Sequence, residues 1–211
     1  MPEHEISPFL HFAEHRLQEV ALVFMAVAYT LRIRWLLGFK PAGDRQPPTG
    51  LSNATKGALH SLANIAMPWA MESYRRNPLL YAQFVVFHLA VAVAILQSFL
   101  IPYAPGVMAN AAIVRLFQVM LGAAVAIGIY RIVRRLADPY MRALSSPDDY
   151  FSLTLLTVWF IFAVLAAPNS TTAGEGALVT YFLMTAFFLI YVPFSKISHY
   201  LYYPFTRYYL G

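Results

Sequence analysis

Long apolar stretches, separated by shorter polar segments, dominate the chain. A bilayer hydrocarbon core is about 30 Å thick, so a helix needs about 20 apolar residues to cross it. Five stretches reach this length and predict membrane-spanning helices at residues 17–39, 79–101, 108–133, 150–167 and 177–203. The pattern therefore predicts an all-α membrane protein, in which five transmembrane helices form a bundle and residues 1–211 make a single membrane domain.

Two other segments have the spacing of amphipathic helices, with apolar residues on one face and polar residues on the other. The spacing over residues 51–76 predicts a cytoplasmic-side amphipathic segment that lies on the membrane or on a partner. Pro68 is expected to bend or end this segment, and Pro204 to end the fifth helix, because proline lacks the N–H that an interior helical position donates. Residues 6–16 are expected to lie on the outer surface in the same way.

Basic residues indicate the orientation of the helices, because loops rich in Lys and Arg stay in the cytoplasm. They gather after the first and third predicted helices and near the C-terminus: Arg32, Arg34, Lys40, Arg45, Lys56, Arg75, Arg76, Arg131, Arg134, Arg135, Arg142, Lys196 and Arg207. The opposite loops, 102–108 and 168–176, carry only the charge of Glu175, and two basic residues, Arg16 and Arg115, fall on that side. We therefore expect a multi-pass protein of the cell's inner (cytoplasmic) membrane, with its N-terminus outside and its C-terminus in the cytoplasm.

Composition agrees with a membrane protein and narrows its chemistry. The chain is 59% hydrophobic and 12% charged, whereas soluble domains are about 25% charged. Because it has no cysteine, it cannot bind a Cys-ligated iron–sulfur cluster or a covalent c-type haem, and it cannot form a disulfide. The cytoplasmic loops explain the net charge of +5, so nucleic acid is not an expected partner.

Two histidines, His88 and His199, lie in apolar stretches. An ionisable side chain inside a membrane is costly and suggests a function. Two histidines on two helices can supply both axial ligands of a haem iron. Both fall in the predicted cytoplasmic leaflet, and their depths on ideal helices differ by roughly 8 Å, which a bend at Pro193 can absorb. On this pattern alone, histidines satisfied by hydrogen bonds between helices are an equal alternative.

Several segments together resemble a known family. The ending "YVPFSKISH" of the fifth stretch is similar to the last helix of the gamma subunit of respiratory nitrate reductase. The cytochrome b membrane subunits of heterodisulfide reductase and of the sulfite-reduction-associated membrane complex have a similar sequence pattern. The segments "FHLAVAVAIL", "AYTLRIRWLLGF" and "YRIVRRLADPYMRALSSPDDYFSLTLL" resemble its second helix, its first-helix ending and its basic loop between helices three and four. The resemblance spans residues 28–203.

The family's gamma subunit holds two b haems with four histidines, and this chain departs from that pattern. Ser98 and Tyr181 stand where the resemblance places the two ligands of the outer haem. His88 and His199 match the pair that ligates the haem on the cytoplasmic side. The resemblance therefore implies a mono-haem variant of this cytochrome b-type domain, with His88 and His199 as the axial ligands of the haem iron.

The expected function is that of a membrane-anchoring cytochrome b subunit in a respiratory oxidoreductase complex. One bis-His haem b would pass electrons between menaquinone or another quinone and a cytoplasmic iron–sulfur partner, so the chain would be an electron-transfer subunit rather than a stand-alone enzyme. Five basic residues are candidates for the haem propionates: Arg75, Arg76, Arg131, Arg134 and Lys196. His60 is expected to lie at the membrane interface and is the reserve candidate for proton handling near the quinone. Met184 is expected to pack in the core, and ligation of haem is its alternative role. The other reading is a haem-free anchor or assembly subunit of a larger complex.

Overall fold

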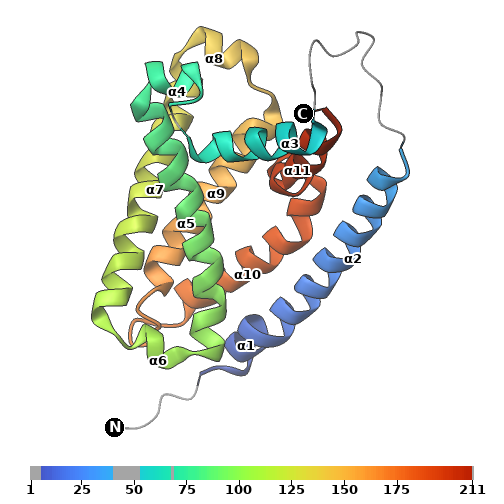
Figure 1. The fold of residues 1–211 in the computed structure, drawn as a ribbon. Coiled ribbons are helices and arrows are strands. Elements are labelled where there is room, and N and C mark those ends of the chain that lie inside the picture. Colours follow the sequence, from blue (N-terminus) through green and yellow to red (C-terminus); the bar gives the residue numbers. More distant parts are fainter. Residues whose placement is uncertain (1–5, 40–52, 68, 211) are drawn as a thin grey trace. The chain divides into compact units, whose positions relative to one another are not determined.

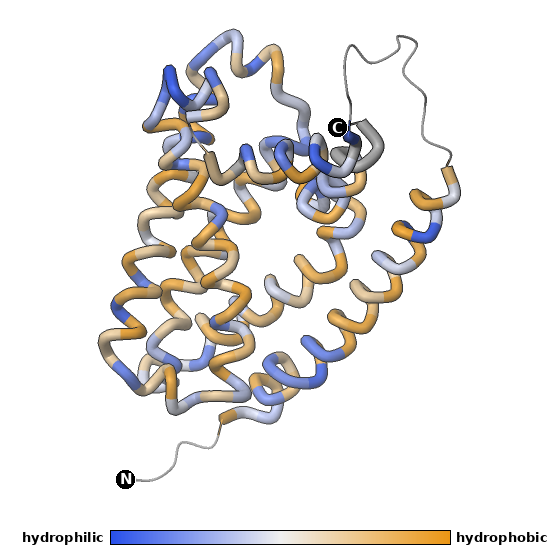
Figure 2. The backbone as a smooth tube through the Cα atoms, in the orientation of Figure 1, coloured by the Kyte–Doolittle hydropathy of each residue, from blue (hydrophilic) through white to orange (hydrophobic). Residues whose placement is uncertain are grey.

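The computed structural model describes residues 6–39, 53–67 and 69–210, and these residues form helices and no strand. Five helical stretches in this part of the chain are long and apolar enough to cross a membrane: Pro8–Leu37, Pro78–Tyr103, Ala111–Ala137, Pro147–Ala166 and Gly176–Phe194. The predicted number and approximate position of the spanning helices are confirmed (Figure 1). Hydrophobic residues run along each of these stretches (Figure 2).

The contacts divide the chain into two compact units, whose positions relative to each other are not determined (Figure 1). The first unit comprises Met1–Phe24 and Gln83–Tyr191, and the second comprises Met25–Ala82 and Val192–Gly211. His88 belongs to the first unit and His199 to the second. Each unit is therefore described by itself.

The first unit is built on the helices α5 (Pro78–Tyr103), α7 (Ala111–Ala137), α9 (Pro147–Ala166) and α10 (Gly176–Tyr191), with short helices α6 (Pro105–Met108) and α8 (Pro139–Leu144) in two connections. Polar side chains fix the helix starts. Asn110 caps α7, Asp138 caps α8, and Ser146 with Asp149 forms a capping box on α9. These caps satisfy N–H groups that have no partner within the helix.

Helix α7 packs along α9, and a small residue allows the close approach. Gly128 is buried, and a Cβ built on it would lie 2.3 Å from Oγ1 of Thr157 on α9. Ala124, one turn earlier, is also fully buried, as expected of a small-xxx-small pair. Gly122 and Ala126 have the same spacing but lie away from this contact, since a Cβ on Gly122 would meet nothing within 4 Å and Ala126 is exposed.

The N-terminal segment differs from the surface helix expected at 6–16. Helix α1 (Pro8–His11) runs through a π-helical turn, Phe12–Arg16, into α2 (Leu17–Leu37) without a break. The side-chain amide of Gln18 donates to the carbonyl oxygens of Ala13 and of Phe182 on α10, at 3.0 and 2.8 Å. Residues 8–16 therefore continue into the first spanning helix, whose Gln18 is hydrogen-bonded to α10. They do not form a separate helix on the outer membrane surface.

The fifth apolar stretch is not one helix. Helix α10 ends at Tyr191, and two 3₁₀ turns, Val192–Phe194 and Lys196–Ser198, lead into α11 (His199–Leu210). Pro193 lies in the first turn and lacks the N–H that a continuing α-helix needs. The prediction that Pro204 ends the helix is wrong, because Pro204 lies inside α11. Proline removes only one donor there, and α11 packs against α3 (Ala54–Ala63).

In the second unit, the segment predicted at 51–76 is divided. Helix α3 is followed by a 3₁₀ turn, Asn64–Ala66, and then by α4 (Glu72–Arg76). The helical part ends before Pro68, as expected, although Pro68 itself lies outside the described residues. Residues 51 and 52, and the basic residues Lys40 and Arg45, also lie outside them.

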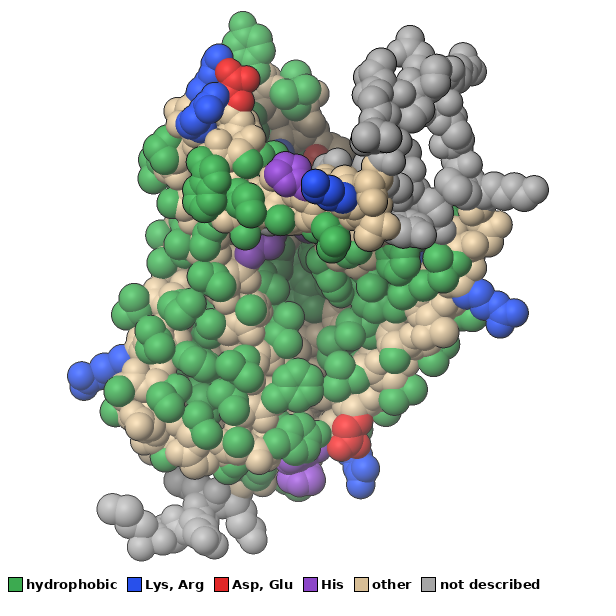
Figure 3. Space-filling view, in the orientation of Figure 1, with side chains coloured by type: hydrophobic (Ala, Val, Ile, Leu, Met, Phe, Trp, Pro, Cys, Tyr) green, Lys and Arg blue, Asp and Glu red, His purple; other side chains and the backbone are tan. Residues whose placement is uncertain are grey.

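Large apolar side chains on the long helices are exposed. Those on α2 include Val20, Val23, Val27, Leu31 and Trp35. Apolar side chains also cover the visible surface of α5 and α7 (Figure 3). Soluble monomers rarely expose apolar surface on this scale, so these faces are suited to lipid.

Candidate functional site

His88 lies on the exposed face of α5, away from the core of the first unit. The opposite face of this helix is buried and includes Phe87, Ala90, Ala94 and Gln97. Nδ1 of His88 lies 2.8 Å from the carbonyl oxygen of Phe84, one turn earlier. A carbonyl only accepts, so Nδ1 of His88 donates this hydrogen bond.

A cationic side chain lies close to this part of α5. The guanidinium of Arg131, on α7, is 5.5 Å from the centre of the Phe87 ring, and Phe87 precedes His88 in the chain. Phe87 also packs edge-on against Phe160 of α9, with 5.2 Å between ring centres. Arg131 is therefore the best placed of the five basic residues proposed to meet a haem propionate, because it contacts the residue next to His88.

His199 is the first residue of α11, in the second unit, and its side chain is exposed. Nδ1 lies 3.0 Å from the carbonyl oxygen of Lys196. The turn before it is held by two serines: the hydroxyl of Ser195 accepts from the N–H of Ile197, and the hydroxyl of Ser198 donates to the carbonyl of Ser195. These bonds fix the backbone that presents His199.

Side chains from α2 hold the same segment within the second unit. The hydroxyls of Tyr29 and Tyr200 are hydrogen-bonded, and their rings meet edge-on with 6.1 Å between centres. The guanidinium of Arg32 lies 4.9 Å from the centre of the Phe194 ring and donates to the hydroxyl of Tyr202 at 3.4 Å. The orientation of His199 is thus tied to the last part of α2, which the sequence did not reveal.

Both candidate ligands share one chemical feature. In each, a main-chain carbonyl accepts a hydrogen bond from Nδ1. Histidine ligands of metals almost always have the second ring nitrogen bonded in this way, which sets the tautomer and the ring orientation. The donor set therefore fits a bis-His haem, although the pairing of the two side chains across the two units stays a prediction.

The place where the family resemblance would put an outer haem is filled by protein. Tyr181 is fully buried, and its hydroxyl donates to the carbonyl oxygen of Ala94 on α5. The hydroxyl of Ser98 donates to the carbonyl of Ile95. Trp159 stacks on Tyr181, with 6.3 Å between ring centres and 12° between planes. The hydroxyls of Ser98 and Tyr181 are therefore both bonded within the protein.

A buried polar network extends this packing. The indole N–H of Trp159 donates to the hydroxyl of Thr185, which donates to the carbonyl of Tyr181. The amide of Gln97, also fully buried, donates to the carbonyl of Ala163. Such bonds offset the cost of burying polar groups between spanning helices and give these helices a defined register.

The other histidines and Met184 lie elsewhere. The rings of His11 and His15 contact each other at a tilt of 42°, with 4.7 Å between their centres, and Nε2 of His15 lies 3.5 Å from the carboxylate of Glu14. His60 is exposed on α3, and Met184 is half-buried on α10. His4 lies outside the described residues. Among the residues that are described, no three His, Cys, Asp or Glu side chains gather as a metal site.

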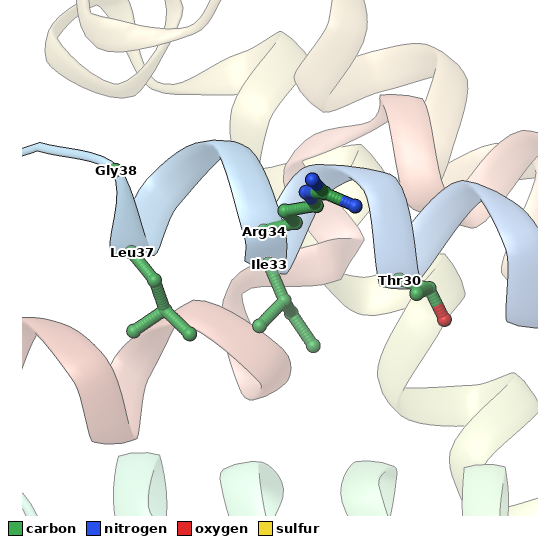
Figure 4. Close-up of a pocket in the computed structure, with 5 residues that line it drawn as sticks. All are labelled: Thr30, Ile33, Arg34, Leu37 and Gly38. Carbon is green, nitrogen blue, oxygen red and sulfur yellow. The ribbon is translucent and has the colours of Figure 1, made fainter.

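An open recess of about 490 Å³ runs along the end of α2 and contains neither candidate ligand. Its lining comes from one face of this helix: Thr30, Ile33, Arg34, Leu37 and Gly38. Ile33 and Leu37 project from the same side of the helix (Figure 4). The recess is mainly apolar and carries no group that can ligate iron.

One polar group was not predicted from the sequence. The hydroxyl of Tyr191, at the end of α10, donates to the carboxylate of Asp148 at 2.9 Å and lies 3.1 Å from the hydroxyl of Ser152. Only the packing of α9 against α10 reveals the partner, since the two residues are far apart in the chain.

Comparisons of the chain with protein-family models, with curated proteins and with solved structures found no match. The likeness to the nitrate-reductase gamma family therefore rests on the segments quoted above.

Proposed function

We propose that the chain is a membrane-anchoring cytochrome b subunit that exchanges electrons between a membrane quinone and a cytoplasmic iron–sulfur partner. The observation that carries this proposal is the shared state of His88 and His199. Both are exposed on described helices, and both donate a hydrogen bond from Nδ1 to a main-chain carbonyl. Two imidazoles oriented in this way can ligate a b haem through Nε2.

In this proposal His88 and His199 would hold the haem iron, and Arg131 would meet a propionate. The haem, when bound, supplies a one-electron carrier in an apolar surrounding. The chain's own residues set the ligand orientation through the carbonyls of Phe84 and Lys196. Arg32, Tyr29 and Tyr200 keep the segment of His199 in place.

The filled position around Tyr181 supports a single haem. With no outer cofactor, electrons would not cross the membrane on this chain, and the quinone would react in the cytoplasmic half. The basic loops, which would lie on that side, offer a surface for the iron–sulfur and catalytic subunits of the complex. Little charge separation would come from this subunit alone.

The direct test of this function is whether a soluble quinol reduces the haem in the purified chain. We expect menadiol, added without oxygen, to produce the absorption bands of a reduced b haem. If the chain contains no haem when it is purified within an intact complex, the proposal is wrong. The remaining function is then that of a haem-free anchor. A haem that dithionite reduces and menadiol does not would contradict the quinone role.

A further inference from the structure

A hydrogen-bonded group that the proposed function leaves unused lies where α9 begins and α10 ends. Asp148 is in the first turn of α9, and Tyr191 is the last residue of α10. The two helices pack against each other, which brings the Tyr191 hydroxyl to 2.9 Å from the Asp148 carboxylate and 3.1 Å from the Ser152 hydroxyl. A hydroxyl bonded to a carboxylate can pass a proton to it.

Two exposed aromatic rings flank this tyrosine. Phe187 stacks on Tyr191, with 5.6 Å between ring centres and 17° between planes, and Phe151 meets it edge-on at 5.6 Å and 79°. The Phe151 and Phe187 side chains are 50% and 45% exposed. Since both helices are candidate membrane spans, a flat ring dissolved in lipid can reach these faces and stack on them.

We propose that Asp148, Tyr191, Phe151 and Phe187 form the headgroup site for the membrane quinol, and that Asp148 is its proton acceptor. This assignment rests on the function proposed above and names the residues of its quinol site. The direction of the observed bond supports it. Tyr191 already donates to Asp148, so its oxygen can accept from a quinol hydroxyl while its own proton moves to the carboxylate.

The reaction balances in protons and electrons. Oxidation of one quinol to a quinone releases two electrons and two protons. One quinol hydroxyl gives its proton to the Tyr191 oxygen while Tyr191 gives its own proton to Asp148. Asp148 then releases that proton to water. The other leaves the second hydroxyl to water at the interface, and both electrons go to the iron–sulfur partner.

The site is tested first by binding, which needs no haem. Equilibrium dialysis of menadiol against the detergent-solubilised chain, without oxygen, gives its dissociation constant. Tyr191→Phe keeps the ring and removes the hydroxyl, and we expect the dissociation constant to rise about threefold to tenfold, the worth of one hydrogen bond. The matched control is Tyr150→Phe, which removes a nearby hydroxyl that donates to the carbonyl of Arg135, and it should bind as the native chain does.

The second arm separates proton transfer from binding. Asn in Asp148→Asn still accepts from Tyr191 but cannot take a proton. We expect near-native menadiol binding and native haem content, with haem reduction at saturating menadiol at least about tenfold slower, as for loss of a general base. Native binding in Tyr191→Phe, or native reduction in Asp148→Asn, would overturn the assignment. Because the binding arm decides the site even in a chain without haem, failure of the site and failure of the proposed function give different results.

Discussion

Replacing either His88 or His199 by Ala is expected to lower the haem b content of the purified chain by at least about tenfold, since even partners outside the ligand shell are worth about 10–100-fold in metal affinity. Each variant removes one of the two imidazoles that the proposal assigns to the iron. The measurement is the reduced-minus-oxidised spectrum, scaled to protein concentration. His60→Ala is the matched control, because His60 is exposed on a different helix of the second unit, and it should keep its haem.

A substitution that retains a ligand separates iron binding from folding. Methionine can ligate haem iron and raises its midpoint potential when it replaces a histidine. We therefore expect His88→Met to hold haem with a higher midpoint potential than the native chain. An unaltered spectrum and potential in either the Ala or the Met variant would remove His88 from the ligand set.

Gly128→Ala is expected to destabilise the protein, although alanine favours helices by about 1 kcal/mol over glycine. The new Cβ would lie 2.3 Å from Oγ1 of Thr157 and within 3.2 Å of its Cγ2 and Cβ. Threonine is short and stiff, so α7 and α9 must separate, and overpacking of this kind costs about 1–3 kcal/mol. Thermal unfolding in detergent, monitored by tryptophan fluorescence, measures the change.

The chain offers a matched control and a rescue for this prediction. Gly122 lies on the same helix with nothing within 4 Å of a built Cβ, so Gly122→Ala should unfold at the native temperature or above it. Adding Thr157→Ala to Gly128→Ala removes the two nearest of the three clashing atoms, Oγ1 and Cγ2, and should recover most of the loss. Equal unfolding temperatures for the Gly122 and Gly128 variants would mean that α7 and α9 do not meet at this point.

The spanning helices were predictable because twenty apolar residues in a row leave few alternatives in a membrane protein. The breaks were harder to place. Pro193 interrupts the fifth stretch, whereas Pro204 lies inside α11. Both are prolines in similar sequence, and the packing of α11 against α3 is a tertiary contact that no local pattern contains.

The residues of the candidate site could be predicted from their type, but the contacts around them could not. His88 and His199 stand out because histidine is rare in apolar stretches. The Tyr29–Tyr200 and Asp148–Tyr191 bonds join residues more than forty positions apart in the chain, so they depend on how the helices pack. The bond from the Tyr181 hydroxyl to the carbonyl of Ala94 likewise depends on helix packing, and the mono-haem variant that the resemblance implies stays a prediction.

The most direct test of the central claim is the number of b haems per chain. It comes from a dithionite-reduced minus oxidised spectrum of the purified protein, with haem quantified against protein. The proposed function predicts one haem b per chain, lost in both His88→Ala and His199→Ala. Two haems would contradict the filled position around Ser98 and Tyr181, and none in an intact complex would contradict the electron-transfer function itself.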